Sequence, residues 1–200
     1  MKKLVVASSN PGKLREIQAI LGPLDYEVLT QTALGIADAE EPHVTFIENA
    51  LAKARHAAGL AGLPALADDS GVCVPALGGE PGVHSARYAG NAAGREERDA
   101  SNNHKLVAAL AACGDRRAYY YCAMVLVRHA ADPQPLIGEG YWWGEISAQA
   151  RGGNGFGYDP HFFLPQLGQT AAELDSEHKN RLSHRGQALR QLVEKLRGFP

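Results

Sequence analysis

The sequence has little of several features that mark special classes of protein. It contains only three cysteines, and their spacing fits neither a disulfide framework nor a zinc site. The apolar run near the N-terminus stops at Ser8, short of the roughly 7–15 residues of a secretory signal. No other run approaches the roughly 18 apolar residues of a membrane span. We therefore expect a protein of the reducing cytoplasm that has no membrane partner.

An excess of charge of one sign is also missing. The 20 Lys and Arg residues against 22 Asp and Glu residues leave a net charge of -2. Without an overall positive field, nucleic acid is not an expected partner, and an anionic ligand must be bound locally. The 200 residues, 45% of them hydrophobic, are typical of a soluble globular protein. We expect one domain over residues 1–200 that is stable without disulfides.

Several catalytic motifs are absent as well. There is no H-E-x-x-H or paired His/Cys spacing, and no G-x-S-x-G, which argues against a zinc hydrolase and an α/β-type serine hydrolase. The phosphate loop G-x-x-x-x-G-K-[ST] is excluded, because Gly12 is the only glycine before Lys13 and Leu14 stands where the motif needs Ser or Thr. The glycine-rich loop at residues 152–160 does not match G-x-G-x-x-G, which excludes a dinucleotide fingerprint there.

Short apolar runs alternate with segments of helical periodicity. The runs predict strands at residues 4–7, 26–30, 64–67 and 119–127, the last buried on both faces, and a strand or hairpin at 136–146. The loose alternation of strands and helices, without internal repeats, predicts a mixed α/β fold.

Capping signals set the expected helix boundaries. Asn10 followed by Pro11 starts a helix that stops at Gly22. Thr45 and Glu48 form a capping box for a helix that ends near residue 59 and carries a polar stripe of Asn49, Lys53 and His56. Further helices are expected at about residues 95–111 and after residue 183.

Residues 8–13 combine hydroxyls, a helix N-terminus and Lys13, which are the components of a phosphate site. A simple helix cap explains the same residues equally well. Two acidic pairs, Glu40-Glu41 and Asp68-Asp69, offer oxygen ligands for Mg²⁺, which needs only one or two carboxylates besides substrate phosphates. Solvent-exposed surface is the simpler interpretation of the first pair, whereas the second directly follows a strand, where α/β sheets place ligands.

Two further segments suit a heterocyclic base. The glycine-rich loop ends in aromatic and polar residues that can stack on a planar ring and bind its edge, although a structural loop with a buried Phe156 is an equal alternative. Lys179, His184 and Arg185 gather hydrogen-bond donors at and before the last helix, where an exposed, capped helix start is the simpler explanation.

Taken together, these segments resemble the inosine/xanthosine triphosphate pyrophosphatase family over nearly the whole chain. The resemblance rests on S-S-N-P-G-K at residues 8–13, T-F-I-E-N-A at 45–50 with Lys53, A-D-D-S-G at 67–71, L-G-G-E-P-G-V-H-S-A-R-Y-A-G at 77–90, G-F-G-Y-D-P at 155–160 and S-H-R-G-Q-A-L at 183–189. Each motif is weak alone, but together and in this order they are highly specific.

The resemblance implies an elongated mixed sheet flanked by helices, two lobes with a central substrate cleft, and a homodimer. It implies hydrolysis of ITP, dITP and XTP to the monophosphate and pyrophosphate, with Mg²⁺ as cofactor. Asp69 would be the proton acceptor and a Mg²⁺ ligand, with Glu40 or Glu41 as the second ligand; which of the two is left open. The implied substrate-binding residues are Ser8, Ser9, Asn10, Pro11, Gly12, Lys13, Lys53, Ser70, Phe156, Gly157, Tyr158, Asp159, Lys179, His184 and Arg185.

The chemistry of these residue types agrees with that reaction. Attack of water on the α-phosphorus requires neutralisation of phosphate charge and a carboxylate to orient the water. A donor cluster prefers the 6-oxo acceptor of hypoxanthine and xanthine over the amino group of adenine. Two alternatives stay open: a nucleotide-binding sensor without turnover, and a related pyrophosphatase for modified pyrimidines.

Overall fold

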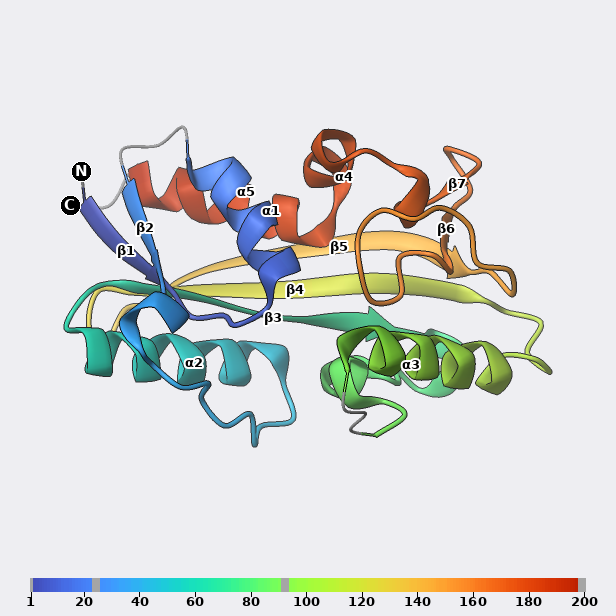
Figure 1. Cartoon of the computed structure of the whole chain (residues 1–200), viewed down its shortest axis with the longest axis horizontal. Coiled ribbons are helices and arrows are strands. Elements are labelled where there is room, and N and C mark those ends of the chain that lie inside the picture. The colour runs from blue at the N-terminus through green and yellow to red at the C-terminus, as the bar shows by residue number, and fades with distance from the viewer. Residues whose placement is uncertain (1, 23–25, 91–93, 198–200) are drawn as a thin grey trace. The chain divides into compact units, whose positions relative to one another are not determined.

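The computed structural model describes residues 2–22, 26–90 and 94–197 (Figure 1). Over these residues the α-helices are α1 (Pro11–Leu21), α2 (Phe46–Ala61), α3 (Arg95–Ala109), α4 (Ser176–Leu182) and α5 (His184–Arg197). The strands are β1 (Lys2–Val6), β2 (Tyr26–Thr30), β3 (Ala65–Cys73), β4 (Arg117–Val127), β5 (Leu136–Ile146), β6 (Phe162–Leu164) and β7 (Gln169–Thr170). No helix within the described ranges has the length and apolar character needed to cross a membrane.

The strands form a mixed sheet. In the described part of the chain, seven strands pair in the order β2-β1-β3-β4-β5-β6-β7. β1 runs parallel to β2 and β3, whereas β6 runs antiparallel to β5 and β7. The predicted α/β class with a mixed sheet flanked by helices is therefore confirmed.

The chain divides into two compact units, each built from separate segments. The first unit comprises Met1–Asp69, Cys122–Gly140 and His184–Pro200, and the second comprises Ser70–Tyr121 and Tyr141–Ser183. Because β3, β4 and β5 each contribute residues to both units, the boundary falls within strands and no linker marks it in the sequence.

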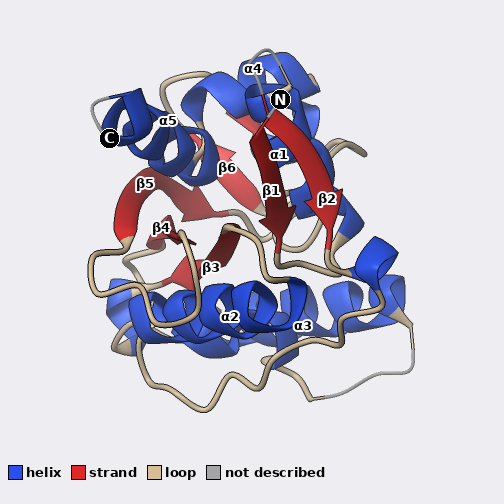
Figure 2. Ribbon diagram, turned by 90° about the vertical axis from the view of Figure 1, so that its left-hand side faces the viewer, coloured by secondary structure: helices blue, strands red, loops and turns tan. Residues whose placement is uncertain are grey.

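The first unit has helices on both faces of its strands (Figure 2). Side chains of β1 alternate between the two faces, as the period of a strand requires. Leu4 packs in one cluster with Ile17 of α1 and Leu189 of α5. Val5 packs in the other cluster with Ala54 of α2, whose buried face consists of alanines apart from Asn49.

The second unit is built around aromatic rings. The ring centroid of Phe162 lies 4.5 Å from that of Tyr120 and 5.4 Å from that of Trp142. Leu106 of α3 and Leu110, which directly follows this helix, pack in the same buried cluster. This core supports the glycine-rich loop, because Tyr158 belongs to it.

Most predicted elements are confirmed. β2 and β5 have the expected bounds, and β5 is a single strand. β4 is buried along nearly its whole length, as expected for a strand covered on both faces. α2 continues past Gly59 to Ala61, where Gly62 ends it with a φ of 63° that favours glycine. α3 stops at Ala109, close to the expected end.

The prediction for residues 64–74 was wrong. We expected the strand to end before the acidic pair, but β3 runs from Ala65 to Cys73 through Asp68 and Asp69 without interruption. Buried carboxylates are normally excluded from strands unless they are paired. Both are paired here, as described below.

Candidate functional site

The loop between β1 and α1 holds the residues predicted to bind phosphate. Asn10 Oδ1 accepts hydrogen bonds from the backbone N–H groups of Gly12 (2.9 Å) and Lys13 (3.2 Å), and Pro11 begins the helix. Ser8 Oγ accepts from the N–H of Asn10 at 3.2 Å. The predicted cap is thus confirmed, and a phosphate would have to displace it to use the N–H groups of Gly12 and Lys13.

Asp68 lies at the centre of a buried ionic cluster in the first unit. Its Oδ2 lies 3.0 Å from Lys13 Nζ and accepts hydrogen bonds from Arg185 Nη2 at 3.1 Å and Nε at 3.3 Å. Burial alone would raise the pKa of Asp68, but the charges of Lys13, Arg185 and Lys53 outweigh it and hold the pKa well below its usual range. Asp68 is therefore a permanent anion that positions two cations.

Asp69 meets a different set of partners, all from α2. Its Oδ1 accepts a hydrogen bond from Lys53 Nζ at 3.0 Å, and its Oδ2 accepts one from Asn49 Nδ2 at 3.3 Å. Burial raises the pKa of Asp69 above its ordinary value, although Lys53 and Lys13 oppose the increase. Two residues of the predicted polar stripe of α2, Asn49 and Lys53, therefore donate hydrogen bonds to this carboxylate. The third, His56, contacts the carbonyl oxygen of Ala37 instead.

The two aspartates differ because consecutive residues of a strand point to opposite faces. Leu66, two residues before Asp68, packs with α1 and α5, whereas Ala67, two residues before Asp69, packs with α2. Asp68 thus meets the cations of α1 and α5, and Asp69 meets Lys53 and Asn49 of α2. Neighbouring carboxyl groups whose pKa values are shifted in opposite directions are typical of sites that need a fixed charge and a proton acceptor.

Glu41 joins this site and Glu40 does not. Lys53 Nζ lies 2.8 Å from Glu41 Oε1 and 3.0 Å from Asp69 Oδ1, so one ammonium holds both carboxylates. Burial lowers the pKa of Lys53, but the charges of Asp69, Asp68 and Glu41 outweigh this effect and raise it. Glu40 is exposed to solvent. The geometry therefore favours Glu41 among the two glutamates that the sequence left open.

In the second unit, Asp159 organises the glycine-rich loop. Its Oδ2 accepts hydrogen bonds from the backbone N–H of Phe156 at 2.8 Å and from Lys179 Nζ at 2.6 Å, and its Oδ1 accepts from the Tyr120 hydroxyl at 3.1 Å. Tyr158 is buried and donates its hydroxyl to the carbonyl of Ser85 at 2.8 Å. The buried Asp159 and Tyr158 thus stabilise the loop. Phe156 is only half-buried, so its ring is the more accessible of the two aromatic rings of the loop.

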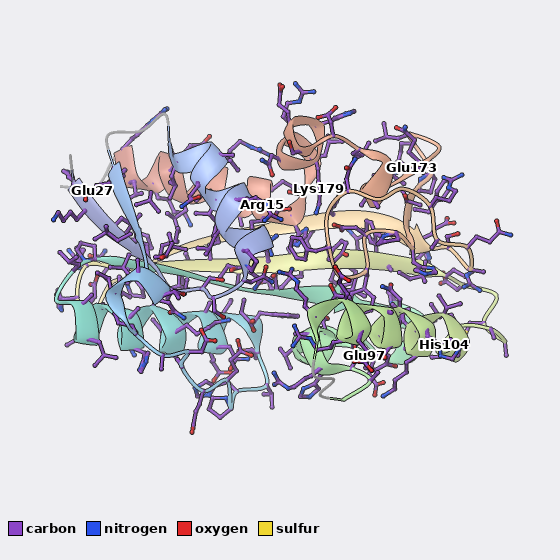
Figure 3. The ribbon with its side chains drawn as sticks, in the orientation of Figure 1. Arg15, Glu27, Glu97, His104, Glu173 and Lys179 are labelled. Carbon is purple, nitrogen blue, oxygen red and sulfur yellow. The ribbon has the colours of Figure 1, made fainter. Side chains whose placement is uncertain are left out.

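The predicted donor cluster is divided between the units. Lys179 lies on α4, a short helix that the sequence analysis did not predict, and Figure 3 labels it there. His184 and Arg185 are the first residues of α5, in the first unit. All three are buried, so the interpretation as an exposed helix start is wrong.

The fit of α5 in the first unit depends on a glycine of β5. A Cβ added to Gly140 would lie 2.0 Å from the carbonyl oxygen of His184, a distance that no real side chain tolerates. Only glycine therefore allows this approach of strand and helix. The helix start that carries Arg185 is held against the strand in this way.

The sequence pattern of the Ham1 family matches residues 4–195, nearly all of the chain. The chain belongs to the Ham1 family. It is 63% identical over 199 residues to the dITP/XTP pyrophosphatase of Ralstonia nicotianae, covering 100% of this chain and 98% of that protein. It is also 63% identical over 196 residues to the dITP/XTP pyrophosphatase of Nitrosomonas europaea, covering 98% of this chain and 95% of that protein.

Solved structures of similar proteins have the same fold. A HAM1 protein from Coxiella burnetii matches with a TM-score of 0.90 and 49% identity, and the match covers 100% of both chains. The nucleoside-triphosphatase / dITP/XTP pyrophosphatase of Mycobacterium abscessus matches with a TM-score of 0.73 and 40% identity over 96% of this chain and 98% of that chain.

Several residues that contact the predicted site residues had not been singled out from the sequence. Glu16 of α1 forms an ion pair with Arg185, and the Cys122 thiol lies 4.0 Å from Asp68 Oδ2. Asp38 accepts a hydrogen bond from the Ser9 hydroxyl at 2.8 Å. Helical spacing hints at Glu16, which follows Lys13 by three residues, but no local signal identifies Cys122 or Asp38.

Proposed function

We propose that this chain hydrolyses ITP, dITP and XTP to the monophosphate and pyrophosphate, and so removes deaminated purines from the nucleotide pool. The observation that carries the proposal is the pair of adjacent aspartates, of which Asp68 lies 3.0 Å from Lys13 Nζ and Asp69 lies 3.0 Å from Lys53 Nζ. The names of the two relatives at 63% identity support the same reaction. We place the reaction in the cytoplasm and expect a homodimer.

The first unit supplies the groups for the phosphates. Lys13 and Lys53 bring positive charge, and the Ser8 hydroxyl and the Asn10 loop offer further polar contacts. Ser70, the first residue of the second unit, is proposed to add another hydroxyl. Asp68 keeps Lys13 in place through their 3.0 Å ion pair. Phosphoryl chemistry depends mainly on such positioning and charge neutralisation.

Asp69 is the proton acceptor of the proposed reaction. Burial raises the pKa of Asp69 above that of an ordinary aspartate, which makes its carboxylate a stronger base. This suits a group that accepts a proton and releases it again. Lys53 and Asn49 fix the carboxylate from the α2 side. The water that Asp69 deprotonates attacks the α-phosphorus, and the bond that breaks joins this phosphorus to the oxygen that leaves with pyrophosphate.

The donor set fits Mg²⁺. Glu41 and Asp69 already share one cation, the Lys53 ammonium, and both offer the carboxylate oxygens that Mg²⁺ prefers. Among the described residues no group of three or more acidic, His or Cys side chains gathers for a metal, but Mg²⁺ needs only one or two carboxylates when phosphates complete its shell. When bound, Mg²⁺ neutralises phosphate charge and lowers the pKa of water.

The second unit supplies the ring for the base. Phe156 offers a stacking face, with the Gly157 backbone beside it. Lys179, His184 and Arg185 are the donors proposed for the 6-oxo edge, which adenine lacks. Lys179 and Arg185 are also engaged with carboxylates, so each must share its protons between protein and base.

The reaction can be tested by its products. The purified protein with Mg²⁺ is expected to convert ITP, dITP and XTP to monophosphates plus pyrophosphate far faster than it converts ATP or GTP. Chromatography of the nucleotides with separate assays of pyrophosphate and orthophosphate measures this. Orthophosphate and a nucleoside diphosphate as products would place the attack at the γ-phosphorus and overturn the proposal.

A matched pair of variants tests the metal ligands. Glu41→Gln is expected to raise the Mg²⁺ concentration for half-maximal ITP hydrolysis by about 10-fold or more, because an amide is a weaker ligand than a carboxylate. Glu40→Gln, the exposed neighbour, is expected to leave the Mg²⁺ curve unchanged. The measurement is initial rate against Mg²⁺ after chelation of resident metal. Equal curves for both variants would remove Glu41 from the metal site.

A further inference from the structure

The Phe156 ring carries two cations. Lys179 Nζ lies 4.8 Å from the ring centroid, and Arg95 Cζ of α3 lies 5.0 Å from it. Both distances are within the range of cation–π interactions, about 6 Å. All three residues belong to the second unit.

The two cations differ in how tightly they are held. The Lys179 side chain is 6% exposed, and its ammonium lies 2.6 Å from Asp159. The Arg95 side chain is 31% exposed, and its Nε lies 3.9 Å from Asp99, at the limit of an ion pair. Arg95 is therefore the cation that can move when a ligand reaches the ring.

The helix that carries Arg95 is fastened to the residue next to the ring. Asp99 Oδ2 accepts a hydrogen bond from the N–H of Gly157 at 3.0 Å, and Asn103 Nδ2 donates to the carbonyl of Gly157 at 2.8 Å. Arg95, Asp99 and Asn103 are spaced four residues apart, on one face of the helix. This face keeps the start of α3 beside the ring.

The place of Arg95 on its helix is unfavourable for a cation. It is the first residue of α3, where the helix dipole favours acidic side chains, and Glu96 and Glu97 follow it in the same turn. Helix stability therefore does not explain an arginine at this position, whereas the contact with Phe156 does.

We propose that Arg95 binds the base, with its guanidinium lying over a purine that stacks on Phe156. The inference rests on the proposed function, in which Phe156 is the platform for the base. A planar guanidinium stacks on aromatic faces, and a purine presents such a face in place of the phenyl ring. Because the contact is with the face and not the edge, Arg95 strengthens binding of ITP and ATP alike.

The variant Arg95→Ala tests this role. The KM for ITP is expected to rise about 3- to 30-fold, which is the range of a cation–π contact, while kcat changes less than about twofold. The KM for ATP is expected to rise by the same factor, and the dissociation constant of IMP, measured by calorimetry, is expected to follow. The melting temperature is expected to stay or increase, because the variant removes a cation from a helix start.

Lys105→Ala is the matched control. It removes a positive charge from the same helix, and Lys105 lies over the Tyr88 ring instead. Its KM is expected to match that of the parent. An unchanged KM in Arg95→Ala would overturn the inference, and a lower KM would mean that Arg95 competes with the base. A parent protein that releases no pyrophosphate from ITP would overturn the proposed function and this inference with it.

Discussion

Asp69→Asn is expected to lower kcat for ITP by about 10²- to 10⁴-fold, the usual cost of losing a general base. The amide cannot accept the proton, yet it has nearly the same shape, and its single oxygen can still accept the hydrogen bond from Lys53 while the one from Asn49 is lost. Folding should therefore persist. Steady-state kinetics with saturating Mg²⁺, together with thermal unfolding, measures both effects.

Asp68→Asn is the control for Asp69→Asn, because it neutralises the adjacent carboxylate. Asp68 holds Lys13 and Arg185 as a buried anion, so its neutralisation is expected to lower the melting temperature, which Asp69→Asn should change little. If Asp69→Asn keeps turnover within a factor of a few of the parent, the proton acceptor is Asp68 or Glu41 and the assignment fails.

The sequence predicted the elements whose signals are local. The Asn10 cap, Pro11 and the Thr45 cap act over a few neighbouring residues, and the structure confirms each of them. The short strands β6 and β7 were not predicted, because two or three residues are too few for a pattern to show. α4 was missed because its seven residues are nearly all polar and show no apolar periodicity.

The full length of β3 could not be predicted from neighbouring residues in the sequence. Two adjacent aspartates normally end a buried strand, and here the compensating cations come from distant parts of the chain. Arg185 is separated from Asp68 by 117 positions. A single sequence carries no signal for such a pairing, although the alternation of a strand explains afterwards why each aspartate has its own partners.

The residue types of the site were predicted better than their arrangement. The lysines, aspartates and aromatic residue come from the motifs, but the motifs do not tell which carboxylate each cation meets. Lys53 turned out to distinguish Glu41 from Glu40, and Asp159 turned out to hold Lys179. These pairings depend on the packing of helices against the sheet, which periodicity does not specify.

The second large effect is expected at Arg185. Its side chain is 2% exposed, and its guanidinium donates hydrogen bonds to Asp68 and forms an ion pair with Glu16. Arg185→Ala removes the cation and leaves both carboxylates behind, so we expect the free energy of unfolding to fall by about 3–5 kcal/mol. Urea unfolding followed by circular dichroism measures the loss. Arg185→Lys, which keeps the charge without the planar fork, is expected to recover part of it.

The Arg185→Ala variant also distinguishes a structural role of Arg185 from recognition of the base. If Arg185 also donates to the 6-oxo group, the ratio of kcat/KM for ITP to that for ATP should fall about 10- to 100-fold, measured where the variant remains folded. Lys13→Ala is the matched control, because it too removes a cation from Asp68 but touches phosphates common to every nucleotide, and its ratio should stay nearly unchanged. A stability loss below about 1 kcal/mol would contradict the anchoring role. An unchanged ratio with a large stability loss would make Arg185 a structural anchor only, and selection of the base would then depend on Lys179 and the loop around Phe156.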